Sequence, residues 1–266
     1  MGFDVGFASD VGRQRSRNED NLYVCDFTEN DVKGHGLLFA VADGMGGHQG
    51  GALASRLAIE TLGSYYDEEV SKESVEAIMS MIVRRANDTI RTRSSMDPEF
   101  SRMGTTLTGA LLCEPSKLRV WHIGDCRGFI VRDGQLDQIT NDHSLVADQV
   151  RLGIITPDEA ENHPAKNVIT RALGTRKEVT PDIYEELFQP GDRLMICCDG
   201  LHGVVSADEM LRIMLDAESA KDGCQRLVER ANELGGPDNI TVVLVHYQEP
   251  NGLWEWVSDL FEGDSE

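Results

Sequence analysis

The segment Leu37-Leu38-Phe39-Ala40-Val41-Ala42-Asp43-Gly44 is an apolar run that ends in an aspartate and a glycine. Six consecutive apolar residues before a turn signal are typical of a strand that is buried on both faces. The Asp43 carboxylate therefore stands where a buried strand leaves its sheet. Glycine-rich sequence follows in Met45-Gly46-Gly47-His48-Gln49-Gly50-Gly51, and a stretch with helical periodicity begins there.

Three further aspartates occupy similar places. Asp125 and Asp199 each follow an apolar run, and Asp238 stands just before the apolar run 240–245. Because strand ends meet at one edge of a sheet, we expect these carboxylates and Asp43 to share a pocket. Clustered carboxylates repel one another unless a cation lies between them, and oxygen-only ligands favour Mg²⁺ or Mn²⁺ over Zn²⁺. The pattern predicts an enzyme that uses a hard metal ion.

Composition bounds the class of protein. The chain has 266 residues, of which 40% are hydrophobic and 27% charged, and no Pro/Gly/Ser-rich linker divides it. We therefore expect one large domain over residues 1–248, followed by an acidic, aromatic tail over 249–266. The net charge of −21 disfavours a nucleic-acid partner, which normally requires a basic patch.

Cysteine usage and hydropathy indicate the compartment. None of the six cysteines forms a CxxC pair, and Cys197 and Cys198 are neighbours in a strand-like run, where alternation points them to opposite faces. We expect all six to be reduced thiols of a cytoplasmic protein. No apolar run approaches the roughly 18 residues needed to span a bilayer, and no signal segment follows Met1, so we expect no membrane association.

The periodicity predicts strands grouped by tight turns, with helices between the groups. Asp133-Gly134 in particular signals a two-residue hairpin turn. Hairpins dominate over regular strand–helix alternation, so we predict an α+β fold of two packed, mainly antiparallel sheets flanked by helices, an αββα sandwich. The expected strands are 4–9, 22–26, 37–42, 105–112, 118–123, 128–131, 136–140, 193–198 and 240–246. The expected helices are 52–66, 75–93, one after Ser206, 220–234 and a short one at 156–159.

Single motifs leave alternatives open. The glycine-rich loop after Asp43 fits neither nucleotide fingerprint, so it is a tight turn or a loop that brings backbone close to a metal. The cluster around Arg15, Glu19 and Asp20 is a surface salt-bridge network or a phosphate grip beside a metal ligand. Residues 141–180 are polar and irregular, which is typical of a mobile functional loop.

Taken together, the motifs resemble the metal-dependent protein phosphatase family, type 2C, in its bacterial single-domain form. They span most of the chain in the expected order. The matching elements are Arg15 with Asn18-Glu19-Asp20, Asp43-Gly44-Met45-Gly46-Gly47-His48, Met103-Gly104-Thr105-Thr106, Gly124-Asp125-Cys126-Arg127, Cys198-Asp199-Gly200 and Gly236-Pro237-Asp238-Asn239-Ile240-Thr241.

The resemblance implies a site of two tightly coupled Mn²⁺ or Mg²⁺ ions with a weaker third. Asp43 would bridge the pair, and Asp199 and Asp238 would complete the first position. The Gly44 carbonyl, with Glu19 or Asp20, would serve the second. Asp125 together with Asp199 would form the third site, and residues 141–180 would include the mobile flap.

Catalytic roles follow from this site and from general chemistry. A water between two divalent ions loses its proton near neutral pH and can attack phosphorus, while Arg15 would hold the substrate phosphate. His48 is a candidate general acid for the leaving serine or threonine oxygen, or a packing residue of the glycine loop.

The resemblance implies a protein serine/threonine phosphatase of signal transduction that opposes a Ser/Thr kinase. We expect this protein to be a monomer. Two other classes remain open: a catalytically inactive phosphoprotein-binding module and a metal phosphoesterase that acts on small molecules. The sequence departs from the family pattern at Cys126, where serine is usual, and at His202-Gly203, where Ser/Thr-Asp often stands. Neither departure removes a ligand.

Overall fold

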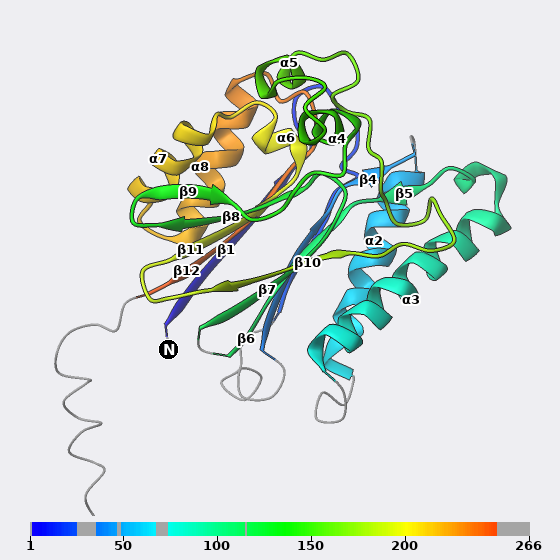
Figure 1. The fold of residues 1–266 in the computed structure, drawn as a ribbon, viewed down its shortest axis with the longest axis horizontal. Coiled ribbons are helices and arrows are strands. Elements are labelled where there is room, and N and C mark those ends of the chain that lie inside the picture. The colour runs from blue at the N-terminus through cyan, green and yellow to red at the C-terminus, as the bar shows by residue number, and fades with distance from the viewer. Residues whose placement is uncertain (1, 26–35, 47–48, 68–73, 115, 249–266) are drawn as a thin grey trace, which may run out of the picture.

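The computed structural model describes residues 2–25, 36–46, 49–67, 74–114 and 116–248. Within these ranges two five-stranded antiparallel sheets pack face to face, and helices cover both outer faces (Figure 1). The predicted αββα sandwich is confirmed. The tail 249–266, predicted to follow the catalytic domain, lies outside the described residues.

The first sheet has the order β1-β12-β11-β8-β9 and the second has the order β10-β7-β6-β3-β2. The strands of the first sheet are β1 (Phe3–Asp10), β8 (Arg127–Arg132), β9 (Gln135–Gln138), β11 (Arg193–Cys197) and β12 (Ile240–Tyr247). Those of the second are β2 (Asn21–Val24), β3 (Leu37–Ala42), β6 (Leu107–Glu114), β7 (Lys117–Ile123) and β10 (Asp182–Leu187). A small two-stranded sheet pairs β4 (Gly44–Met45) with β5 (Gly104–Thr105).

Two pairs of helices cover the sheets. Helices α2 (Gly50–Gly63) and α3 (Val75–Met96) pack on the second sheet, and α7 (Ala207–Asp216) and α8 (Ala220–Glu233) pack on the first. The shorter helical segments are η1 (Ser64–Asp67), η2 (Pro98–Phe100), α4 (Leu145–Arg151), α5 (Pro157–Glu161) and α6 (Asp199–His202). No helix in the described ranges is both long and apolar enough to cross a membrane.

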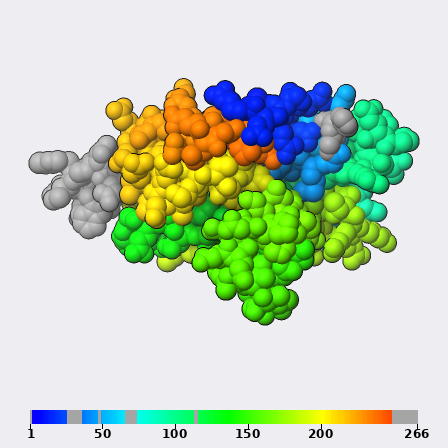
Figure 2. All heavy atoms as spheres, turned by 90° about the horizontal axis from the view of Figure 1, so that it is seen from above, coloured from blue at the N-terminus to red at the C-terminus, as the bar shows by residue number. Residues whose placement is uncertain are grey.

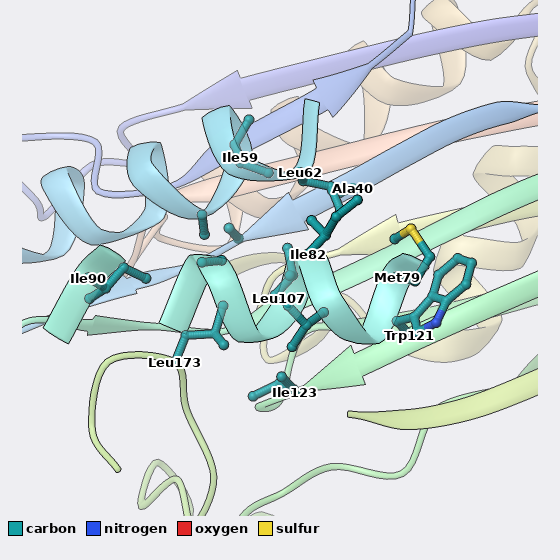
Figure 3. Packing of buried hydrophobic residues seen from close by; sticks show 14 of the residues in the cluster. Ala40, Ile59, Leu62, Met79, Ile82, Ile90, Leu107, Trp121, Ile123 and Leu173 are labelled. Carbon is teal, nitrogen blue, oxygen red and sulfur yellow. The ribbon is translucent and has the colours of Figure 1, made fainter. Parts of the chain in front are cut away.

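The core has three apolar layers. One lies between the sheets, and it contains Phe39 of β3 and Ile196 of β11. A second lies under α7 and α8. The third lies between the second sheet and α2 and α3, where Trp121 lies beside Met79 of α3 (Figure 3). These layers fix both sheets, and therefore they fix the strand ends from which the site is built.

Local sequence explains several element boundaries. The Ser206 hydroxyl accepts the Glu209 N–H at 3.4 Å, which confirms the predicted start of α7. The Asp133-Gly134 turn has positive φ at both residues, as the hairpin between β8 and β9 requires. Cys197 and Cys198 face different core layers, as alternation predicted.

Several short elements differ from the sequence expectation, namely β4, α4, α6 and β10. β10, which pairs with the edge of β7, was not predicted because Asp182-Ile183-Tyr184-Glu185-Glu186-Leu187 is acidic and largely exposed. The segment 141–180, expected to be irregular apart from a short helix at 156–159, contains α5, which confirms that helix, and also α4, which was not predicted. Short helices such as these depend on their caps, here Ser144 and Thr156, more than on periodicity.

Candidate metal centre

The predicted acidic residues meet at one end of the sandwich. Strands β3, β7 and β11 end there, and β12 begins there, because the strands are antiparallel. Asp43, Asp125 and Asp199 follow the three ending strands, and Asp238 precedes β12. The negative charges of Asp20, Asp125, Asp199 and Asp238 all raise the pKa of Asp43, after burial, which is the largest cause.

Two threonines hold the backbone of Asp43. The Asp43 N–H donates to the Thr106 hydroxyl at 2.8 Å, and the Thr106 N–H donates to the Asp43 carbonyl at 2.9 Å. The Thr105 hydroxyl donates to the same carbonyl at 2.7 Å. The Met103-Gly104-Thr105-Thr106 motif therefore fixes the exit of Asp43 from β3.

Asn239 holds the loop that contains Arg15 and Asp20. Its side-chain amide donates to the carbonyls of Val11 and Arg17, each at 2.9 Å, and its Oδ1 accepts the Glu19 N–H at 2.8 Å. The same residue follows Asp238 directly. The start of β12 and the 11–20 loop are thus one rigid unit, and Asp20 and Asp238 belong to it together.

Burial makes the carboxylates costly to ionise. Asp20 and Asp125 are each only 6% exposed. Burial raises the pKa of Asp20 to about 7, and the charges of Asp199 and Asp238 add to the rise. Burial and the charge of Asp199 raise the pKa of Asp125 to about 8. Burial also raises the pKa of Asp199, with the charge of Asp238 as the next cause. A divalent cation would reverse this balance by stabilising the ionised forms.

Several of these oxygens have no hydrogen-bond partner. Both carboxylate oxygens of Asp20, and one each of Asp125 and Asp199, are buried without one in the described chain. The Thr241 hydroxyl and Cys198 thiol lower the pKa of Asp20, but neither makes a hydrogen bond of normal geometry with it. Buried polar atoms without partners are rare in native proteins, and their presence here indicates a site for a bound water or ion. The donor set is all oxygen, which fits Mn²⁺ or Mg²⁺.

The carboxylates gather at one end of the sandwich, but their oxygens do not yet form a complete coordination site. Within the described part of the chain, no three His, Cys, Asp or Glu side chains already stand in an arrangement that would hold an ion. The residues present fit a divalent pair in chemistry and burial, and binding would draw their oxygens together.

Glu19 and Asp20, which the sequence left as alternatives for one ligand, point to different places. Asp20 lies in the acid cluster. The Glu19 carboxylate and the Gly44 carbonyl lie against Gly51 in the first turn of α2, where a Cβ would collide with both. A glycine is therefore required at position 51, and the Glu19 carboxylate stands beside the positive end of a helix.

Arg15 lies at the open side of the cluster. Its Nη2 donates to Asp238 Oδ2 at 2.6 Å, and the Arg15 side chain is 53% exposed. The Asn239 N–H donates to the other oxygen of Asp238 at 2.8 Å. The guanidinium thus offsets part of the negative charge while it remains accessible to a phosphate.

Other residues singled out by the sequence have definite places. His48 lies outside the described residues. Cys126 is buried, and its Sγ lies 3.1 Å from the Thr106 hydroxyl, so it joins the group that holds Asp43. His202 Nε2 lies 3.0 Å from the Asp125 carbonyl oxygen. Burial lowers the pKa of His202 to about 4, so the ring is neutral at physiological pH.

The segment 141–180 covers one side of this end. It contains α4 and α5, which lie above the sandwich in Figure 1, and it forms a lobe that projects from the body in Figure 2. His143 at its base is 3% exposed and bonds to Gly124, next to Asp125. This contact could not be predicted from the sequence, because nothing local links His143 to a residue 19 positions earlier.

Comparison with known proteins gives a consistent result. A family model described as protein phosphatase 2C matches residues 13–237. The chain is similar to the serine/threonine protein phosphatase PstP of Mycobacterium tuberculosis, with 41% identity over 236 residues. That alignment covers 89% of this chain but 43% of PstP, so the chain spans less than half the length of this relative. It is also 36% identical to the phosphatase stp of Listeria monocytogenes, over 90% of this chain and 94% of the relative.

Solved structures agree in fold. The catalytic domain of PstP in complex with two manganese ions superposes with a TM-score of 0.79 at 37% identity, covering 93% of this chain and all of that one. The serine/threonine phosphatase of S. agalactiae superposes with a TM-score of 0.85 at 32% identity, again over 93% of this chain and all of the neighbour. The resemblance found in the sequence is therefore confirmed.

Proposed function

Because this chain belongs to the protein phosphatase 2C family, we propose that it hydrolyses phosphoserine and phosphothreonine in proteins with the help of Mn²⁺ or Mg²⁺. The observation that supports this most strongly is the cluster of buried carboxylates with unpartnered oxygens at the end of the sandwich. Burying these carboxylates costs free energy if the site binds an uncharged ligand, whereas a divalent cation stabilises their ionised forms.

We assign the ligands by position. Asp43 would serve both ions of the tightly bound pair, Asp199 and Asp238 would help to hold the first, and the Gly44 carbonyl would help to hold the second. Asp20 is the better candidate than Glu19 for the second ion, since its two oxygens are buried in the cluster without partners. Asp125 with Asp199 is assigned to a weaker third site.

Residues of this chain would orient the substrate and offset the negative charge of its phosphate. When bound, a pair of divalent ions would lower the pKa of a water molecule so that it can attack phosphorus near neutral pH. Arg15 would exchange its bond to Asp238 for a bidentate grip on two phosphate oxygens. Thr105, Thr106 and Asn239 hold the ligand-bearing backbone in place before substrate arrives. His48 remains the candidate acid for the leaving oxygen.

The partners follow from this reaction. Phosphoproteins are the substrates, and a Ser/Thr kinase that phosphorylates them is the opposing partner in signal transduction. We place the protein in the cytoplasm as a monomer. The net charge of −21 argues against nucleic acid as substrate.

Activity with metal tests the proposed function directly. The purified chain with Mn²⁺ should release phosphate from a phosphothreonine peptide and from an aryl phosphate, and excess chelator should abolish both activities. Colorimetric phosphate release measures this result. Binding of the phosphopeptide without release would instead identify an inactive binding module. Faster release from a nucleotide than from the phosphopeptide would identify a small-molecule phosphoesterase.

Arg15→Ala should lower kcat/KM for the phosphopeptide by about 30-fold, because a charge-assisted hydrogen bond contributes about 2 kcal/mol. Most of the change should be in KM, since the guanidinium grips the phosphate before and during reaction. Arg17→Ala is a matched control, because Arg17 is an exposed arginine of the same loop whose bond to Asn239 uses only its backbone carbonyl. Equal kinetic constants for both variants would contradict the assignment.

A further inference from the structure

The turn that holds Asp125 requires a glycine. Gly124 has a φ of +110°, and a Cβ at this position would stand 2.5 Å from Cγ2 of Thr106. Only glycine tolerates this conformation, and the flexibility of glycine means that contacts from outside the turn help to fix its shape. Three groups of this turn, the Gly124 N–H and the carbonyls of Gly124 and Asp125, are held by two histidines from distant parts of the chain.

His143 holds Gly124 on one side. The His143 N–H donates to the Gly124 carbonyl at 2.7 Å, and the Gly124 N–H donates to His143 Nδ1 at 3.0 Å. Because Nδ1 accepts, the ring proton must be on Nε2, which lies 3.1 Å from Asp182 Oδ2. Arg171 donates to the other oxygen of Asp182. The chain of contacts therefore joins the base of the 141–180 segment to the Asp125 turn.

His202 holds Asp125 on the other side. Its Nε2 lies 3.0 Å from the Asp125 carbonyl oxygen, so this nitrogen carries the proton and donates. His202 is the last residue of α6, and α6 begins at Asp199. One short helix therefore connects Asp199 to the backbone of Asp125. Both nitrogens of His143 and the Nε2 of His202 are occupied by these bonds, so the two rings are placed to orient the turn and not to bind an ion there.

We propose that His143 and His202 are positioning residues that hold the Asp125 turn against Asp199 and so set the affinity of the weakest divalent-cation site. The inference rests on the proposed function, since it takes Asp125 and Asp199 as the ligands of that site. His202 stands where the family often has serine or threonine, so the bond from His202 to Asp125 is a particular feature of this chain. Residues that orient ligands in this way contribute about 10- to 100-fold in metal affinity.

The test compares variants that keep or lose each bond. His202→Leu removes the donor, whereas His202→Gln retains an N–H near the same position. His143→Leu removes the acceptor, whereas His143→Asn retains one. His246→Gln is the control, because His246 lies near the other end of β12 and is also a poorly exposed histidine. Mn²⁺ binding is measured by calorimetry, and amide hydrogen exchange of residues 124–127 is measured on the metal-free protein.

We expect both leucine variants to weaken the weakest Mn²⁺ binding event by about tenfold and to speed amide exchange in the turn. The two amide variants should restore most of both properties, and His246→Gln should change neither. Unchanged weak-site affinity and exchange in both leucine variants would overturn the inference. So would equal losses in the leucine and amide variants. If the leucine variants fail to fold, His202→Gln and His143→Asn must still show near-normal weak-site affinity.

Failure of the proposed function gives a different result. In that case the unaltered protein would neither bind Mn²⁺ nor release phosphate. An unaltered protein that binds several Mn²⁺ ions and hydrolyses phosphopeptide, together with insensitive histidine variants, would contradict the positioning role alone.

Discussion

Asp43→Asn should lower kcat for phosphopeptide hydrolysis by about 10³-fold or more, because it removes the carboxylate assigned to bridge both ions and thus disturbs two charges at the reacting centre. The fold should persist. Asparagine is nearly isosteric, and the bonds from Thr105 and Thr106 to residue 43 use only its backbone. Steady-state kinetics at saturating Mn²⁺ measures the effect, and a calorimetric titration should show loss of the tight binding events.

Two companion variants make this result specific. Asp238→Asn should also cause a large loss, and it additionally weakens the partner of Arg15. Asp137→Asn changes an exposed carboxylate of β9 and should leave kcat unchanged. A near-normal rate in Asp43→Asn or Asp238→Asn would remove the basis of the ligand assignment.

The fold followed from the sequence where burial imposes a clear pattern. Runs such as 37–42 and 240–245 are strands of the sandwich because both of their faces contact apolar layers. β10 escaped prediction because an edge strand with one neighbour needs few apolar residues. The convergence of Asp43, Asp125, Asp199 and Asp238 was predictable, since antiparallel topology brings those strand ends to one side.

Side-chain direction within the site was less predictable. Glu19 and Asp20 are adjacent in an extended segment, and only the packing of Gly51 against Gly44 decides which of them enters the cluster. The bonds from His143 and His202 to the Asp125 turn join residues 19 and 77 positions apart. Pairings of that range depend on the whole fold, and no local propensity encodes them.

The metal-free protein should lose stability as the pH rises from 6.5 to 8. The folded-state pKa values of Asp20 and Asp125 are raised to about 7 and about 8. In the folded protein both carboxyl groups therefore lose their protons within this pH range. In the unfolded chain both are already ionised, with a pKa near 3.8. A raised folded-state pKa gives stability that is present at low pH and is lost as pH passes through that value.

Buried histidines have the opposite effect on stability, but mainly at lower pH. Burial lowers the pKa of His122, His202 and His246 to about 4, which makes stability rise with pH, and this rise fades as the pH passes above the unfolded value of 6.5. Above that pH the carboxylates dominate. We expect a loss of about 2 kcal/mol between pH 6.5 and 8, since one pKa unit corresponds to about 1.4 kcal/mol. For a chain of this size the loss lowers Tm by about 4–8 °C.

Two changes should weaken this pH dependence. Asp125→Asn removes one buried ionisable group, so in chelator the variant should be more stable than the unaltered protein at pH 8 and should show a flatter profile. Mn²⁺ should stabilise the unaltered protein more at pH 8 than at pH 6.5, because the ion binds the ionised carboxylates. Thermal denaturation with and without Mn²⁺ measures both effects. A metal-free Tm that stays constant or rises over this range would show that ionisation of these carboxylates does not destabilise the fold. The cluster would then need no cation, and the argument for a metal site at this end of the sandwich would fail.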